Sequence, residues 1–192
     1  MKNINKIKLL TIWLCTGFIM LGMMSSANAL LIDPTTTTPL TTGNQTSTKE
    51  ITAAITAYIG SSTEYYKQNA GGTEEGALSG SYETTFGPSG SSDGYSSAVI
   101  SCVGGPFISG DAFLLVKDGN ATPAWYLFDL TALGWTGTDT IQLSGFWRNV
   151  PGAISHVTLY GGGTAVPEPS TILLLGGGLL ALAACGKRFR KA

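Results

Sequence analysis

The sequence has an uncharged apolar segment near each end, and basic residues lie on the outer side of both segments. The first runs from Leu9 to Met24 and follows Lys2, Lys6 and Lys8; the second covers 169–186 and precedes a basic C-terminus. Basic residues beside a membrane span stay on the cytoplasmic side. The two ends therefore predict that whatever domain lies between them is on the far side of the membrane.

The N-terminal segment has the three parts of a secretory signal peptide. A cationic start precedes the apolar run, and small residues follow, with Ala27 and Ala29 in the A-x-A pattern that signal peptidase recognises. We predict a signal peptide over 1–29, export through the Sec translocon and cleavage before Leu30. A lipoprotein site is disfavoured because Cys15 follows a bulky leucine rather than a small residue.

The C-terminal segment predicts a transmembrane helix. Its eighteen residues rise about 27 Å at about 1.5 Å each, close to the ~30 Å hydrocarbon core of a bilayer. Long basic side chains reach the interface and make up the remaining length. The basic residues that act as the stop-transfer signal are Lys187, Arg188, Arg190 and Lys191.

The residues before this span add a specific motif. The run Val166, Pro167, Glu168, Pro169 and Ser170, the short apolar span and the basic tail together resemble a PEP-CTERM sorting signal, which we place over 165–192. The resemblance implies recognition by an exosortase, with cleavage near the Pro-Glu-Pro triplet. It also implies a Gram-negative bacterium that makes exopolysaccharide, and a final location at its cell surface or in its extracellular matrix.

Composition indicates one acidic domain between the two ends. From Leu30 to Val166, four basic residues stand against eleven acidic ones, a net charge of −7. Such a domain repels phosphate backbones, which excludes nucleic acid as a partner. The Thr-rich, Pro-punctuated stretch 30–47 predicts an extended linker, and 48–164 predicts a β-rich extracytoplasmic domain.

Turn residues divide this domain into short segments. We expect strands over 81–86, 95–101, 112–117, 124–130, 140–147 and 153–160, and mostly loops elsewhere between 60 and 94. Regularly spaced short strands favour a mainly β fold, an antiparallel β-sandwich or jelly roll. Ser47 and Glu50 match a capping box, so one short helix is expected over 48–59, ended by Gly60.

Two groups of residues suggest ligands. Trp125, Trp135 and Trp147 would stack on sugar rings if exposed, or fill the core if buried, and the pattern favours the core for most of them. Oxygen-bearing residues near turns either form those turns or bind calcium. This second group comprises Asp93, Asp118, Asn120, Asp129 and Asp139.

Catalytic signals are weak. His156 is the only histidine, Cys102 is the only cysteine between the two apolar segments, and no G-x-S-x-G motif precedes a helix. Two carboxylates such as Asp111 and Asp129 are enough for a small hydrolase, although no spacing singles out a pair. We therefore expect no catalytic residues and no obligatory cofactor. The leading hypothesis is a structural or interaction protein, and the alternative is a carbohydrate-binding module that uses exopolysaccharide as its partner.

Overall fold

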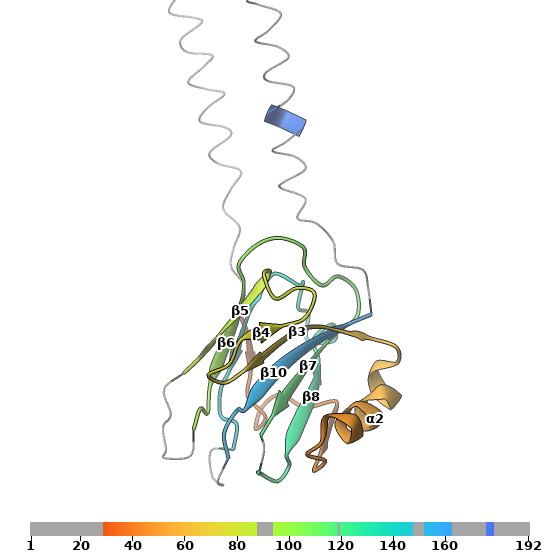
Figure 1. The fold of residues 1–192 in the computed structure, drawn as a ribbon, viewed down its shortest axis with the longest axis vertical. Helices are drawn as coiled ribbons and strands as arrows, with labels where there is room; N and C mark the ends of the chain where they lie inside the picture. The colour runs from red at the N-terminus through yellow and green to blue at the C-terminus, as the bar shows by residue number, and fades with distance from the viewer. Residues whose placement is uncertain (1–28, 88–93, 119, 148–151, 163–175, 179–192) are drawn as a thin grey trace, which may run out of the picture.

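The computed structural model describes residues 29–87, 94–118, 120–147, 152–162 and 176–178. Over these ranges the chain forms two β-sheets, with the helix α2 (Thr48–Ile59) beside one of them (Figure 1). The strands are β1 (Ala29–Ile32), β2 (Thr41–Gly43), β3 (Thr63–Asn69), β4 (Glu74–Glu75), β5 (Tyr82–Phe86), β6 (Ala98–Cys102), β7 (Ala112–Lys117), β8 (Trp125–Asp129), β9 (Thr140–Leu143) and β10 (His156–Gly161).

The smaller sheet, here called sheet A, has the strand order β1-β9-β6-β5. β1 runs parallel to β9, whereas the β9–β6 and β6–β5 pairs are antiparallel. Its side chains alternate in burial: Ile141 and Leu143 are buried, while Gln142 between them is exposed. This alternation is typical of strands with one face on the core and one face in water.

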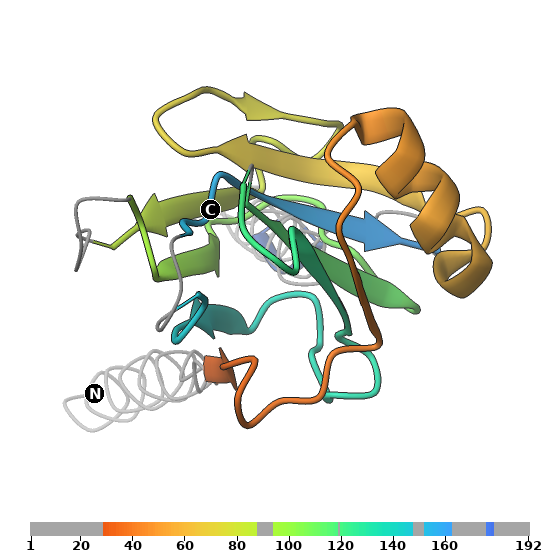
Figure 2. The ribbon, with the colours of Figure 1, turned by 90° about the horizontal axis from the view of Figure 1, so that it is seen from below.

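The larger sheet, sheet B, has the order β2-β8-β7-β10-β3-β4 and is antiparallel throughout. β7 is apolar along most of its length because both of its faces are covered. Leu114 and Val116 belong to the core shared with sheet A, and Phe113 and Leu115 belong to a second cluster with α2. Figure 2 shows α2 on the side of sheet B that faces away from sheet A.

The main core lies between the two sheets. Sheet A contributes aliphatic side chains from β1, β6 and β9, and sheet B contributes side chains from β3, β7, β8 and β10. Its side chains with no exposed surface include Ile32, Tyr66, Leu114, Val116, Phe128, Ile141, Val157 and Leu159. Fully burying one such side chain stabilises the fold by about 1.5–3 kcal/mol.

The helix predicted over 48–59 is confirmed with the same limits. The Ser47 side chain accepts a hydrogen bond from the backbone N–H of Glu50 and donates one to its carboxylate, and the N–H of Gly60 bonds to the carbonyl of Thr56. The helix buries Ile51, Ile55 and Ile59 against sheet B. Local capping and an apolar stripe are thus sufficient to define this element.

The linker predicted over 30–47 is corrected by the structure. This stretch supplies β1 to sheet A and β2 to sheet B, and it crosses from one sheet to the other. Asp33 holds the crossing: its side chain accepts hydrogen bonds from Thr35, and its carbonyl accepts the N–H groups of Thr36 and Thr37. Threonine fits strands as well as linkers, so composition alone misled the prediction.

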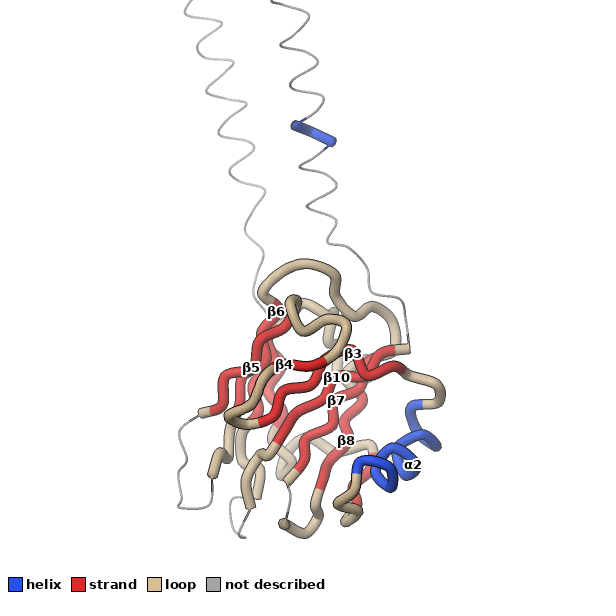
Figure 3. The backbone as a smooth tube through the Cα atoms, viewed as in Figure 1, coloured by secondary structure: helices blue, strands red, loops and turns tan. Residues whose placement is uncertain are grey.

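The mainly β prediction is confirmed, with strand limits that differ in detail (Figure 3). The strand expected over 140–147 ends at Leu143, because Gly145 has φ +74° and turns the chain. β3 lies in a region predicted as mostly loop; its residues Glu64, Lys67 and Gln68 hide the strand pattern. The parallel β1–β9 pair makes sheet A mixed rather than purely antiparallel.

Among the described residues, no helix is long and apolar enough to cross a membrane. Several predicted features lie outside the described residues: the signal peptide before Ala29, the motif Val166–Ser170 and the four basic tail residues. Of the predicted transmembrane segment, only 176–178 is described.

Candidate functional site

Trp125 is held on the side of sheet B that α2 covers. It is 1% exposed, and its indole Nε1 donates a hydrogen bond to Gln45 Oε1 at 3.2 Å. Gly43, opposite Trp125 on β2, packs so closely on the ring that a side chain there would collide with it. A ring enclosed in this way has no face left for a sugar.

The other two tryptophans are also enclosed. Trp135 is 8% exposed and donates its indole N–H to the Asp139 carbonyl at 2.7 Å. Trp147 is 5% exposed and donates to the Pro123 carbonyl at 2.8 Å. All three tryptophans are therefore buried, which agrees with the core alternative that the pattern favoured for most of them and leaves no exposed ring for the sugar-stacking alternative. Bulk and a satisfied indole N–H account for their positions.

The aspartates near turns accept hydrogen bonds from backbone N–H groups. Asp118 Oδ1 accepts the N–H of Asn120 at 2.9 Å, and Asp118 Oδ2 accepts the N–H of Ala153 at 2.6 Å. Asp129 accepts the N–H of Ala132, and Asp139 accepts both the N–H and the hydroxyl of Thr136. Asp93 lies outside the described residues. Over the ranges that are described, no group of three or more His, Cys, Asp or Glu residues is placed to hold a metal ion.

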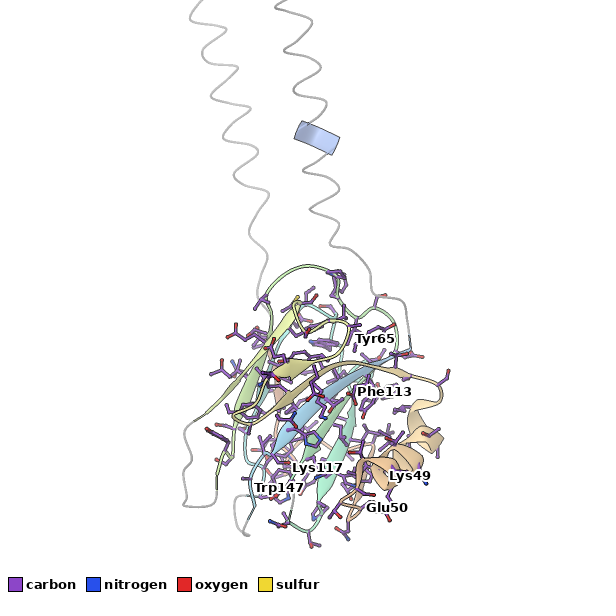
Figure 4. The ribbon with its side chains drawn as sticks, in the orientation of Figure 1. Lys49, Glu50, Tyr65, Phe113, Lys117 and Trp147 are labelled. Carbon is purple, nitrogen blue, oxygen red and sulfur yellow. The ribbon has the colours of Figure 1, made fainter. Side chains whose placement is uncertain are left out.

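His156 lies at the start of β10, between Asn69 on β3 and Lys117 on β7. Burial, and to a smaller extent the charges of Lys117 and Lys67, together lower the pKa of its imidazole to about 4. The ring is therefore neutral at pH 7. Figure 4 shows Lys117 near one end of β7 and Phe113 nearer the other. Neutral His156 lies among lysines instead of the carboxylate that a catalytic triad requires.

The two remaining catalytic candidates lie apart from His156 along the sheets. Cys102 ends β6 in sheet A and is half-buried, opposite Tyr82 of β5. Asp111 directly precedes β7, and its carbonyl accepts the N–H of Gly162 just after β10.

Buried tyrosine hydroxyls form hydrogen bonds that no sequence pattern indicated. Tyr82 donates to the Gly137 carbonyl at 2.8 Å and accepts the N–H of Ile108 at 2.9 Å. Tyr66 shares a 2.7 Å hydrogen bond with Thr84 and so joins β3 of sheet B to β5 of sheet A. Burial raises the pKa of both phenols well above the usual value, so both stay protonated.

Within the described ranges, the face of sheet A that points away from the core is exposed. Leu31, Gln142, Val99 and Thr85 are neighbours across its four strands, and each of them is exposed. Glu83 is the single charged residue in these four strands. The alternating polar and apolar residues of β9 indicated that one face of this strand is exposed. The sequence did not show that α2 covers the outer face of the other sheet.

The start of β1 and the end of β10 lie at the same end of the domain, uppermost in Figure 1. Gly161 packs on Ile108, whose carbonyl packs on Gly137. Gly137 lies just before β9, and Ala29 begins β1 beside the first residue of β9. Both chain segments that lead to the predicted membrane spans are thus attached at one end of the folded domain.

Comparison with known proteins bears on the C-terminus. The family described as the PEP-CTERM protein-sorting motif matches residues 165–188. No curated protein and no solved structure matches the chain.

These observations define an exported protein with a mainly β domain and a C-terminal sorting signal. The signal is a PEP-CTERM motif, which marks the chain as one that an exosortase sorts.

Proposed function

We propose that this chain is a non-enzymatic structural or interaction component of the cell surface or exopolysaccharide matrix of a Gram-negative bacterium. The match to the sorting motif carries the proposal, because it begins at 165, directly after β10 and the last described residue of the domain, Gly162. The Sec translocon would export the chain, and the exosortase would cut near Pro167-Glu168-Pro169. For the fold we retain a β-sandwich or jelly roll, since both place a core between two facing sheets.

The contacts of the polar residues support a structural role. Asp118, Asp129 and Asp139 fix loops through backbone N–H groups, and Tyr66 and Tyr82 tie distant segments together. The carboxylate oxygens and phenol hydroxyls of these residues are already engaged in hydrogen bonds of the scaffold. Their use in the scaffold favours a presented, rigid domain over an enzyme.

The test of this proposal is the fate of the full chain in an exosortase-positive host. We expect wild-type protein in the surface or matrix fraction, with a mass that lacks the residues after the triplet. Replacing Pro167, Glu168 and Pro169 by alanine should leave uncut protein in the inner membrane. A matched control replaces Gly162, Gly163 and Thr164 by alanine, upstream of the motif. Equal surface delivery of the triplet variant would refute sorting through this motif.

A second candidate function is carbohydrate binding, with calcium as an optional cofactor. The exposed face of sheet A favours it, since amide and hydroxyl groups of Gln142 and Thr85 are exposed there beside a single charged residue, Glu83. Glycan-array binding of the secreted protein, with and without calcium, tests this function. We expect Gln142→Ala to weaken binding and Thr42→Ala, on β2 of the other sheet, to leave it unchanged. If neither variant loses sugar binding, any sugar site lies elsewhere on the protein.

A further inference from the structure

The bond that signal peptidase is predicted to cut lies inside a paired strand. β1 begins at Ala29, and the predicted cut separates Ala29 from Leu30. In the parallel pair with β9, Ala29 lies opposite Thr140 and Leu30 lies opposite Ile141. Leu30 also packs against the main core, and Ile32, two residues further on, has no exposed surface.

We propose that pairing of β1 with β9 and removal of the signal peptide exclude each other, so that the cut comes first and β1 joins sheet A last. This inference rests on the proposed export by an N-terminal signal peptide. It adds an order of events: the strand that completes sheet A is kept out of the sheet until its first residue has been released from the leader.

The exclusion follows from how a protease holds its substrate. The residues around the cut bond must lie extended in a cleft, with their side chains in pockets of the enzyme. In the folded domain, one backbone edge of β1 is bonded to β9, and Leu30 and Ile32 point into the core. Proteases therefore cut such segments through an open form of the substrate, at a rate set by its population.

The position of β9 in the chain keeps the bond accessible at first. β9 follows β1 by about 110 residues. Synthesis at about 5–20 residues per second needs on the order of 5–20 s to supply them. During this interval β1 has no partner strand. The interval ends once β9 is present, because Leu30 and Ile32 can then pair with Ile141 and Leu143 and pack in the core.

The proposal is tested with the full-length precursor, purified in detergent and treated with signal peptidase. Cleavage rates before Leu30 are measured for folded protein and normalised to an unstructured peptide covering 20–36. We expect folded wild type to be cut at least about tenfold more slowly than the peptide. Ile32→Asp, which places a charge in the core side of β1, should restore most of the rate.

Leu31→Asp is the matched control, because Leu31 lies on the same strand but is 57% exposed. It should remain as resistant as wild type. If Ile32→Asp does not fold, folded wild type against its own urea-unfolded form gives the same comparison. Equal normalised rates for folded and unfolded chains would overturn the order of events and leave export intact. Absence of a cut before Leu30 in every state would instead overturn the signal-peptide prediction and the inference with it.

Discussion

Ile32 of β1 lies opposite Leu143 of β9, in parallel register, and both side chains are buried in the core between the sheets. This contact joins residues about 110 positions apart, and it attaches the start of the domain to the middle of sheet A. A stretch with the composition of a linker thereby becomes part of the core.

Ile32→Ala should lower the free energy of unfolding by about 2–5 kcal/mol, because the side chain has no exposed surface and its loss leaves a cavity. Leu31→Ala is the matched control on the same strand and should change stability by no more than about 0.5 kcal/mol. Urea denaturation followed by tryptophan fluorescence measures both. Equal effects of the two variants would show that β1 is not docked.

Ser47→Ala should destabilise the domain by about 0.5–2 kcal/mol, since it removes both hydrogen bonds between Ser47 and Glu50 at the start of α2. Thr52→Ala, at an exposed position within the helix, should be neutral or slightly stabilising because alanine has the higher helix propensity. Comparing the urea midpoints of the two variants separates the loss of the cap from the general effect of placing alanine in this helix. A neutral Ser47→Ala would argue against the capping box.

Tyr82→Phe should cost about 1–3 kcal/mol of stability with little change in fold. The substitution keeps the ring but leaves the Ile108 N–H and the Gly137 carbonyl without their partner. Tyr58→Phe, on the exposed side of α2, is the control and should be neutral. Thermal unfolding by circular dichroism gives both values. A neutral Tyr82→Phe would mean that water replaces the hydroxyl.

Stability should fall on acidification because of His156. Its pKa is about 4 in the folded chain against 6.5 in the unfolded chain, so the unfolded state binds more protons between these values. The contribution is complete above pH 6.5 and is lost as the pH falls toward 4, by on the order of 1–3 kcal/mol. His156→Gln should remove this part of the decline between pH 7 and pH 4.5. The same slope in both proteins would assign it to carboxylates instead.

Local signals in the sequence were enough for some elements. α2 is set by Ser47, Glu50 and three isoleucines on one stripe, all within 14 residues. β7 was predicted with its observed limits, because its continuous apolar run lies between turn residues. In both cases the information that decides the structure is close along the chain.

Other features depend on partners that are distant along the chain. The four residues of β1 look like any apolar patch after a signal peptide until β9 pairs with them. The burial of Trp125 depends on α2 covering sheet B, which strand alternation cannot reveal. The sequence left the core and sugar-stacking alternatives for Trp125 open for this reason: periodicity separates two faces of a strand, but it does not say which of them reaches water.

The position of β10 has a mechanical consequence. Its last residue leads to the sorting motif, and β10 is bonded to β7 on one side and to β3 on the other. While the chain is tethered through its C-terminus, a load applied to the opposite end of the domain pulls along β10. The force is then resisted by two hydrogen-bonded ladders in shear, whose bonds must break together rather than one after another. The domain is thus held by one of its internal strands, and the tether bears load without peeling an edge of the fold.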